Sequence, residues 1–232
     1  MITVRRANER GHANFGWLNS FHTFSFGEYH DPNHMSFRTL RVINDDTVQP
    51  ANGFGEHPHR DMEIISYVID GELEHKDSLG HGAVLKTGEV QAICAGTGIT
   101  HSEFNPSKTK AVHFLQIWIL PGKKGLKPRY QQEMLSRFKN DNGLTLFVSN
   151  REEDQCLIIS QDAKIYHGKL KAGQSRKYQT SKDRGLWIQM INGNITVGEN
   201  VISQGDGISI EQTTEFTLES ISDSEFLLFD LK

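Results

Sequence analysis

Short runs of apolar residues, several of them alternating with polar ones, recur along the chain between turn residues. Residues 64–69 are rich in β-branched and aromatic side chains and end at Asp70-Gly71, a dipeptide typical of a hairpin turn. Residues 112–120 form a similar run that stops at Pro121-Gly122. Further runs of this kind lie at residues 144–148, 157–160, 186–191, 194–197 and 226–231. Many short strands with turns between them predict an all-β sandwich or barrel.

One segment favours a helix instead. Residues 130–138 begin just after Pro128 and contain neither glycine nor proline, which predicts a short helix. The preceding residues 121–128 contain two prolines, two glycines and three lysines, a composition typical of a solvated connector.

A weak internal repeat crosses this connector. Residues 68–73, VIDGEL, resemble residues 190–195, MINGNI, and a second glycine turn follows each of them, at Gly88 and Gly205. We therefore expect two related β-barrels with short helices at their junction. The expected N-terminal domain covers residues 1–128 and the C-terminal domain residues 129–232.

Composition and charge exclude several classes of protein. With 36% hydrophobic residues and 21 glycines among 232, the chain has the apolar content of a globular protein. Its net charge of −4 gives no electrostatic footprint for nucleic acid. Cys94 and Cys156 are too few for a disulfide framework. The N-terminal residues lack the apolar core of a signal peptide, and no apolar run approaches the ~18 residues of a membrane span. We therefore expect a cytoplasmic protein with reduced thiols.

The histidines are distributed unevenly. Ten of the 11 lie between His12 and His113, and only His167 lies in the second half of the chain. The first half thus contains many candidate metal ligands. The C-terminal barrel cannot repeat any histidine cluster, so we expect it to hold no metal and to act as a scaffold or as a wall of the cleft.

Two pairs of ligand-type residues share one spacing. His57 and His59 are two residues apart, as are His101 and Glu103. Residues i and i+2 of a strand face the same side, so the four side chains converge if the two strands are neighbours in a barrel. Three imidazoles and a carboxylate suit a borderline divalent cation and leave coordination positions open for a substrate. The alternative is that each pair is incidental.

The residues around these pairs resemble a known family. Residues 53–71, with two histidines before a glutamate and a glycine, resemble the first cupin motif, and Gly98 to Asn105 resembles the second. The amino-acid sequences of residues 57–63, 96–103 and 21–29 resemble those of the pirin family within the cupins. The resemblance is strong over residues 5–121 and faint beyond them. It implies a bicupin of two jelly-roll domains with a metal in the N-terminal one.

The resemblance also implies the ligands of that metal, which are His57, His59, His101 and Glu103. A typical cupin uses the glutamate of the first motif, here Glu63, whereas pirins use the position of Glu103. We favour Glu103 and expect Glu63 to have a hydrogen-bonding role. The expected cofactor is one divalent transition metal, iron in the first place, with manganese, nickel, copper, cobalt or zinc as alternatives.

Pirins resemble the quercetin 2,3-dioxygenases, cupins that open the central ring of flavonols with O2 and release carbon monoxide. The resemblance therefore implies a flavonol and O2 as partners, with Glu103 as metal ligand and general base. We also expect a monomer that binds neither nucleic acid nor membrane. One alternative is a metal-dependent regulatory module without turnover, since pirin relatives include a transcriptional co-regulator. Another is metal-assisted isomerisation or hydrolysis of a small acid.

The remaining histidines of the first half have simpler interpretations. We expect His22, His30 and His34 to be packed or surface residues, and His113 to make an interior hydrogen bond. His75 and His81 flank the loop around Gly80 and are expected to face solvent.

Overall fold

The computed structural model describes all residues from Met1 to Lys232 and divides the chain into two compact units of β-structure. The N-terminal unit consists of Gly11–Arg137 together with Leu157–Gln161. The C-terminal unit consists of Met1–Arg10, Phe138–Cys156 and Asp162–Lys232. The predicted all-β bicupin is thereby confirmed. No helical segment of the structure has the length and hydropathy needed to traverse a lipid bilayer.

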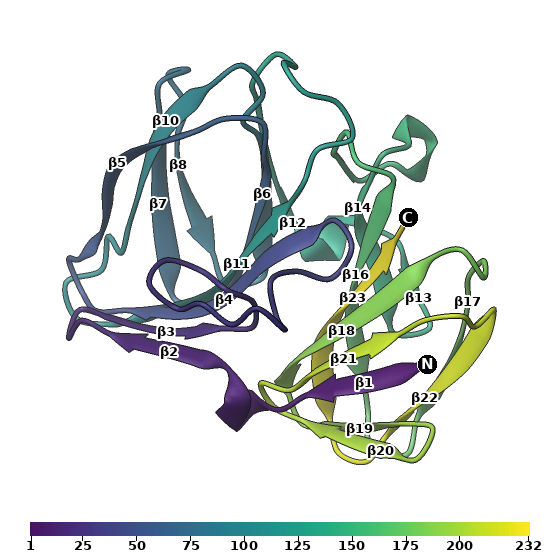
Figure 1. The fold of residues 1–232 in the computed structure, drawn as a ribbon. Helices are drawn as coiled ribbons and strands as arrows, with labels where there is room; N and C mark the ends of the chain where they lie inside the picture. The colour runs from purple at the N-terminus through teal and green to yellow at the C-terminus, as the bar shows by residue number, and fades with distance from the viewer. The chain divides into compact units, whose positions relative to one another are not determined.

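The N-terminal unit contains two antiparallel sheets (Figure 1). One has the strand order β12-β9-β6-β11-β4-β3-β2 and the other the order β5-β10-β7-β8. The elements of this unit are β2 (Gly11–Asn14), β3 (Leu18–His22), β4 (Leu40–Val48), β5 (Gly53–His59), β6 (Glu63–Asp70), β7 (Glu72–Asp77), β8 (Gly82–Lys86), β9 (Glu89–Cys94), β10 (Ile99–Phe104), β11 (Val112–Ile119), β12 (Arg129–Met134), the 3₁₀ turn η2 (Leu135–Arg137) and β15 (Leu157–Ile158).

The C-terminal unit repeats this arrangement. Its larger sheet has the order β1-β21-β18-β23-β16-β14-β13, and its smaller sheet the order β17-β22-β19-β20. The elements are β1 (Ile2–Arg5), the 3₁₀ turn η1 (Ala7–Glu9), β13 (Asn140–Asp141), β14 (Leu144–Ser149), the 3₁₀ turn η3 (Glu152–Asp154), β16 (Ala163–Leu170), β17 (Ser175–Gln179), β18 (Gly185–Asn192), β19 (Asn194–Val197), β20 (Asn200–Ser203), β21 (Gly207–Ile210), β22 (Glu215–Ser220) and β23 (Ser224–Leu231).

The predicted helix at residues 130–138 is wrong. Residues 129–134 form strand β12, which pairs in antiparallel register with β9, and only Leu135–Arg137 turn helically. The absence of glycine and proline permits a helix but does not require one. The free edge of β9 offers a full ladder of backbone hydrogen bonds, and this tertiary pairing overrides local preference. The short helices expected at the junction are the 3₁₀ turns η2 and η3.

The two units also differ from the predicted division at residues 128 and 129. Residues 1–10 belong to the C-terminal unit, because β1 pairs with β21 from Ile2↔Ile210 to Arg5↔Gly207 and forms the edge of the larger sheet. Residues 129–137 and 157–161 belong to the N-terminal unit. In the latter segment, Ile158 exchanges hydrogen bonds with the side chain of Gln131. Strand pairing, which composition does not reveal, thus sets the limits of each unit.

Asp206 fixes the N-terminal segment to its unit. The buried carboxylate accepts hydrogen bonds from Arg6 Nη1 at 2.9 Å, from the backbone N–H of Ala7 at 2.7 Å and from that of Ser203 at 3.1 Å.

We expect Asp206→Ala to lower the free energy of unfolding by about 2–3 kcal/mol, because several donors lose one buried acceptor. Urea unfolding measures this change, and hydrogen exchange should show residues 1–10 losing protection. Glu153→Ala, which removes an exposed ion pair with Arg151, is the control and should leave stability unchanged. Equal effects of the two substitutions would contradict the role of Asp206.

The buried side chains of the N-terminal unit change from apolar to polar along its strands. Val68 of β6 and Phe114 of β11 belong to an apolar core together with Leu73 and Leu85 of the smaller sheet. Two residues further along the same faces, Ser66 and Gln116 are also buried but are polar. An apolar core therefore adjoins a buried polar region inside one barrel, and that region surrounds the candidate site.

Candidate metal centre

Strand β10 is the central strand of the site, because it pairs with β5 on one side and β7 on the other. His101 lies opposite His57 of β5, and Ile99 lies opposite His59. On the other side Glu103 lies opposite His75 of β7. The ladder of β5 and β10 is irregular between His101 and Glu103, so that Phe54 is the residue of β5 opposite Glu103. The pairing of β5 with β10 that the motif spacing required is present.

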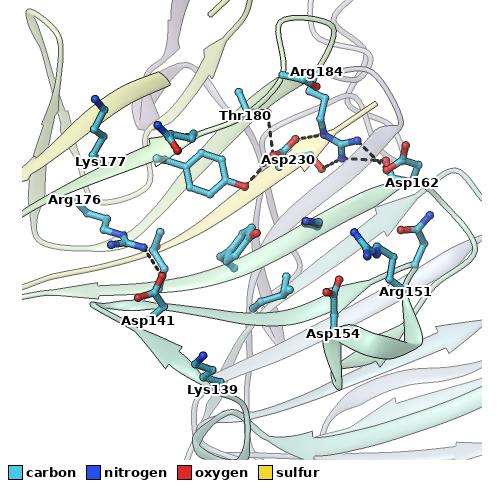
Figure 2. Close-up of a pocket in the computed structure, with 18 residues that line it drawn as sticks. Lys139, Asp141, Arg151, Asp154, Asp162, Arg176, Lys177, Thr180, Arg184 and Asp230 are labelled. Atoms are coloured by element: carbon cyan, nitrogen blue, oxygen red, sulfur yellow. Dashed lines mark hydrogen bonds and ion pairs between the residues drawn. The ribbon is translucent and has the colours of Figure 1, made fainter. Parts of the chain in front are cut away.

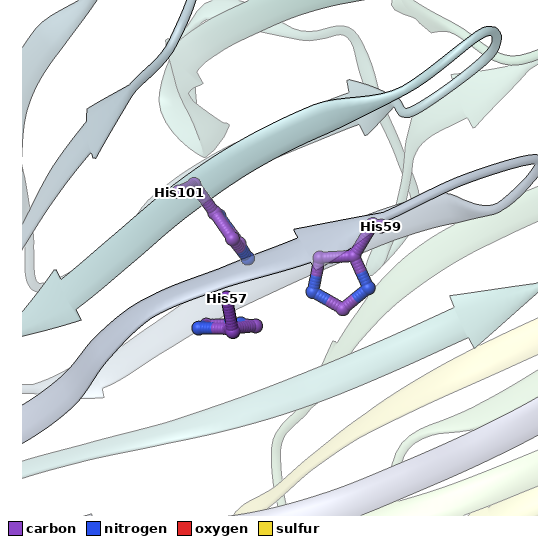
Figure 3. Close-up of side chains that lie close together, drawn as sticks. All are labelled: His57, His59 and His101. Atoms are coloured by element: carbon purple, nitrogen blue, oxygen red, sulfur yellow. The ribbon is translucent and has the colours of Figure 1, made fainter.

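His57, His59 and His101 form one compact group (Figure 3). Their ligand nitrogens all lie within 4.8 Å of one another, and the ring centroids are 4.5–4.9 Å apart. His57 Nδ1 lies 2.8 Å from the carbonyl oxygen of Gly55. Donation by Nδ1 to this carbonyl leaves Nε2 as the free ligand atom, an arrangement common in metal-binding histidines.

Several ring nitrogens of this group have no protein partner. His59 Nε2 and both nitrogens of His101 are buried without a hydrogen bond. Buried polar atoms are nearly always satisfied, so such a concentration requires an explanation. A divalent cation fits, because neutral imidazole nitrogens are its preferred donors. Burial, reinforced by the neighbouring histidines, lowers the pKa of His59 to about 4 and that of His101 to about 3, so both are neutral at pH 7.

Glu103 is in a second group, with His75 and His101, whose ligand atoms also lie within 4.8 Å of one another. Its carboxylate is buried and accepts hydrogen bonds from Gln116 Nε2 at 2.7 Å and Gln91 Nε2 at 3.1 Å. Ser66 Oγ lies at 3.4 Å. Burial raises the pKa of Glu103 to about 7 although these hydrogen bonds oppose the shift. Of the four predicted ligands, three form one group, and Glu103 adjoins that group through His101.

Glu63 belongs to neither group. Its side chain is fully buried, and its Oε1 accepts hydrogen bonds from the backbone N–H of Ser160 at 2.8 Å and from the Ser160 hydroxyl at 2.5 Å. Glu63 therefore makes hydrogen bonds, as expected. Its partner, Ser160, lies 97 residues away in the sequence.

His75 was expected to face solvent, and this expectation is wrong. The residue is fully buried, with Nε2 3.1 Å from Asp77 Oδ2 and Nδ1 without a partner. Its ring stacks on Tyr130, which stacks in turn on the half-exposed His81. The pairing of β7 with β10 turns His75 inward, opposite Glu103. The spacing of His75 and Asp77 was the available signal, since residues two apart share a face.

His30 is exposed, and most of the other histidines have local partners. His113 lies 2.6 Å from Asp45, and His34 lies 2.6 Å from Asp31. His22 is buried with Nδ1 2.8 Å from Asn44 Oδ1. These contacts agree with the packed or hydrogen-bonded roles expected for His22, His34 and His113.

A cavity of about 520 Å³ lies in the same unit. Its wall contains the aromatic residues Phe15, Trp17, Phe26, Tyr29 and Phe54 and the polar residues Ser20, His22, Asn44 and Asp46. Phe54 is the strand partner of Glu103. The ring of Phe26 contacts that of Trp118 edge to face with centroids 5.3 Å apart, and the ring of Trp118 contacts that of His59 with centroids 5.0 Å apart. Trp118 therefore links one ring of the cavity wall to the histidine group, although none of the three histidines lines the cavity itself.

Asp46 is the buried carboxyl group of this cavity. Its Oδ1 has no hydrogen-bond partner, and burial raises its pKa to about 7 against the opposing hydrogen bond with Ser20. The cavity thus combines five aromatic rings with several polar groups, and sites for small organic molecules likewise combine apolar walls with polar groups that fix orientation.

Comparison with known families and proteins agrees with this architecture. Residues 3–119 match the family model described as Pirin, and residues 146–231 match the model described as quercetinase C-terminal cupin domain. Together the two matches cover both units of the fold, including the half of the chain in which the sequence resemblance was faint.

Individual relatives match over the whole chain. The quercetin 2,3-dioxygenase of Escherichia coli K12 is 47% identical over 231 residues, covering 100% of this chain and 99% of the relative. A pirin-like protein of Caulobacter vibrioides is 36% identical, covering 99% of each. The crystal structure of the Escherichia coli pirin YhhW in complex with nickel(II) superimposes with a TM-score of 0.95 at 46% identity, covering 100% of this chain and 99% of that one. The chain therefore belongs to the pirin family.

Proposed function

We propose that the protein is a metal-dependent dioxygenase that opens the central ring of a flavonol with O2 and releases carbon monoxide. The observation that carries this proposal is the group of three histidines, two of which have buried nitrogens without a partner, together with an aromatic cavity linked to the group through Trp118. The names of the relatives support it, since the Escherichia coli protein at 47% identity is a quercetin 2,3-dioxygenase.

His57, His59 and His101 would hold the metal, with Glu103 as the fourth ligand. Iron is the first candidate, with manganese, nickel, copper, cobalt and zinc as alternatives, and nickel is the metal bound in the Escherichia coli pirin structure. A divalent cation held by these residues would supply Lewis-acid chemistry and would lower the pKa of a substrate hydroxyl group.

The aromatic cavity would bind the planar substrate. Two rings of the cavity wall are linked to the candidate site, since Phe26 contacts Trp118, which contacts His59, and Phe54 is the strand partner of Glu103. Aromatic rings stabilise a flat polycyclic ligand by burial and by offset contacts. Asn44 and Asp46 supply polar atoms on the same wall, where they can select among hydroxyl patterns.

Glu103 would accept the proton of the flavonol hydroxyl group. A carboxylate whose pKa lies near the working pH is well suited to general base catalysis. Gln91 and Gln116 orient the two oxygens of Glu103 by donating one hydrogen bond to each, and burial excludes water from the carboxylate. The proton therefore passes to an oriented group rather than to solvent.

Metal analysis combined with O2 uptake and carbon monoxide detection tests the proposal. Quercetin is added to protein stripped with a chelator and then reloaded with iron, manganese, nickel or copper. We expect the stripped protein to lose turnover and at least one reloaded form to consume O2 and release carbon monoxide. Full activity in metal-free protein would contradict the proposal. Metal binding without turnover in any form would instead support a regulatory module.

A further inference from the structure

The C-terminal unit contains a cavity of about 1040 Å³ at the place where the N-terminal unit has its histidines. The smaller sheets of the two units have matching strand orders, β5-β10-β7-β8 and β17-β22-β19-β20, so that β17 corresponds to β5. Arg176 and Tyr178 of β17 both line the cavity and are two residues apart, as are His57 and His59 of β5.

The residues opposite them are not metal ligands either. Arg176 lies opposite Leu218 of β22, and Tyr178 lies opposite Phe216. A guanidinium and a phenol thus replace imidazoles in an equivalent strand pair. The cavity is retained while the donor set has changed from one for a cation to one for an anion.

The charges that line the cavity are only partly neutralised (Figure 2). The wall contains six basic and four acidic side chains. Arg184 is paired with both Asp162 and Asp230, the latter also accepting a hydrogen bond from Tyr178 at 2.8 Å. Lys164 makes no ion pair, and neither does Lys139 at the rim. Positive charge therefore remains for a ligand.

Two polar atoms of the wall lack hydrogen-bond partners; one needs an acceptor and the other a donor. Arg176 pairs with Asp141 through Nη2 at 2.6 Å, but its Nε is buried without an acceptor. Asp154 Oδ2 is buried without a donor. A ligand that satisfies both carries an anionic acceptor and a hydroxyl donor.

Aromatic rings supply the remaining wall. Tyr166 and Tyr178 contact each other edge to face with centroids 5.5 Å apart, and Leu144 and Leu146 lie on the same lining. Such a surface favours a flat ring. We propose that this cavity binds a hydroxylated aromatic carboxylate, with the carboxylate on Arg176 and Lys164, the hydroxyl donating to Asp154 and the ring against the two tyrosines.

Calorimetric titration of the full-length protein tests this inference. The probe is 3,4-dihydroxybenzoate, compared with benzoate, which lacks hydroxyl donors, and with 3,4-dihydroxybenzyl alcohol, which lacks the charge. We expect saturable binding of the probe and at least ~10-fold weaker binding of both analogues. Equal binding of the neutral alcohol, or no binding of the probe, would overturn the proposal.

Variants locate the bound probe. Arg176→Gln and Lys164→Gln should each weaken probe binding by at least ~10-fold, whereas Lys182→Gln, an exposed lysine outside the cavity, should not change it. Asp154→Asn should reduce the preference for the hydroxylated probe over benzoate while benzoate still binds. Thermal unfolding checks that each variant is folded. Unchanged binding in folded Arg176→Gln would exclude this cavity, and it would leave the dioxygenase proposal for the other unit untouched.

Discussion

His101→Ala should abolish metal retention and flavonol turnover together. His101 is the one residue shared by both groups of ligand-type side chains, and it is 1% exposed with both ring nitrogens unpartnered. Four-ligand protein sites bind zinc with about 10–16 kcal/mol, so one ligand accounts for about 3 kcal/mol, or roughly 100-fold in Kd. Metal content after gel filtration and O2 uptake with quercetin measure the two losses.

His57→Ala should show the same double loss, because His57 Nε2 is a free ligand atom on the opposite strand. His113→Gln is the matched control, since this half-buried histidine of the same unit pairs with Asp45 and belongs to neither group of ligand-type side chains. It should retain metal and turnover. If His101→Ala kept its full metal content, the assignment of the histidine group as the metal centre would be wrong.

Glu103→Gln should lower turnover by about 10²–10⁴-fold, the usual contribution of a general base. The substitution preserves size but removes the group that accepts the substrate proton. His57, His59 and His101 remain, so metal binds at elevated concentration, and the deficit in kcat persists when the site is saturated. Turnover measured at saturating metal therefore separates loss of the base from loss of a ligand.

Glu63→Gln is the control for this experiment, because Glu63 is a second buried carboxyl group of the same unit that contacts Ser160 instead. Its turnover at saturating metal should remain close to that of the unmodified protein. The opposite pattern, with Glu63→Gln inactive and Glu103→Gln active, would assign the carboxylate of the site to the first motif.

The two-residue spacing of the ligand pairs was informative because strand geometry is local. His57 and His59 face one side of β5, and His101 and Glu103 face one side of β10, as the period of a strand requires. The sequence could not determine which carboxylate adjoins the histidines. Glu63 is directed to Ser160, 97 residues distant, and no local pattern encodes that contact.

The features that the sequence did not reveal depend on which strand edges meet. His75 lies in the charged strand Glu72–Asp77, whose sequence alone suggests a surface hairpin. Only the pairing of β7 with β10 shows that His75 points inward. Residues 129–134 have a sequence compatible with a helix, and only the pairing of β12 with β9 shows that they form a strand. In both cases the partner is distant in sequence, and the hydrogen bonds of the ladder decide the outcome.

The pairing of β1 with β21 has a consequence for how the chain folds during synthesis. The Met1 amino group contacts the Glu211 carbonyl oxygen across 210 residues. At a translation rate of ~5–20 residues per second, β1 leaves the ribosome ~10–40 s before its partner strand is made. During that time the intervening residues of the N-terminal unit can already assemble their sheets, while β1 remains an unpaired strand. Arg5 and Arg6 at its end disfavour premature pairing with another edge. A segment that is synthesised long before its partner strand is therefore among the last to become ordered.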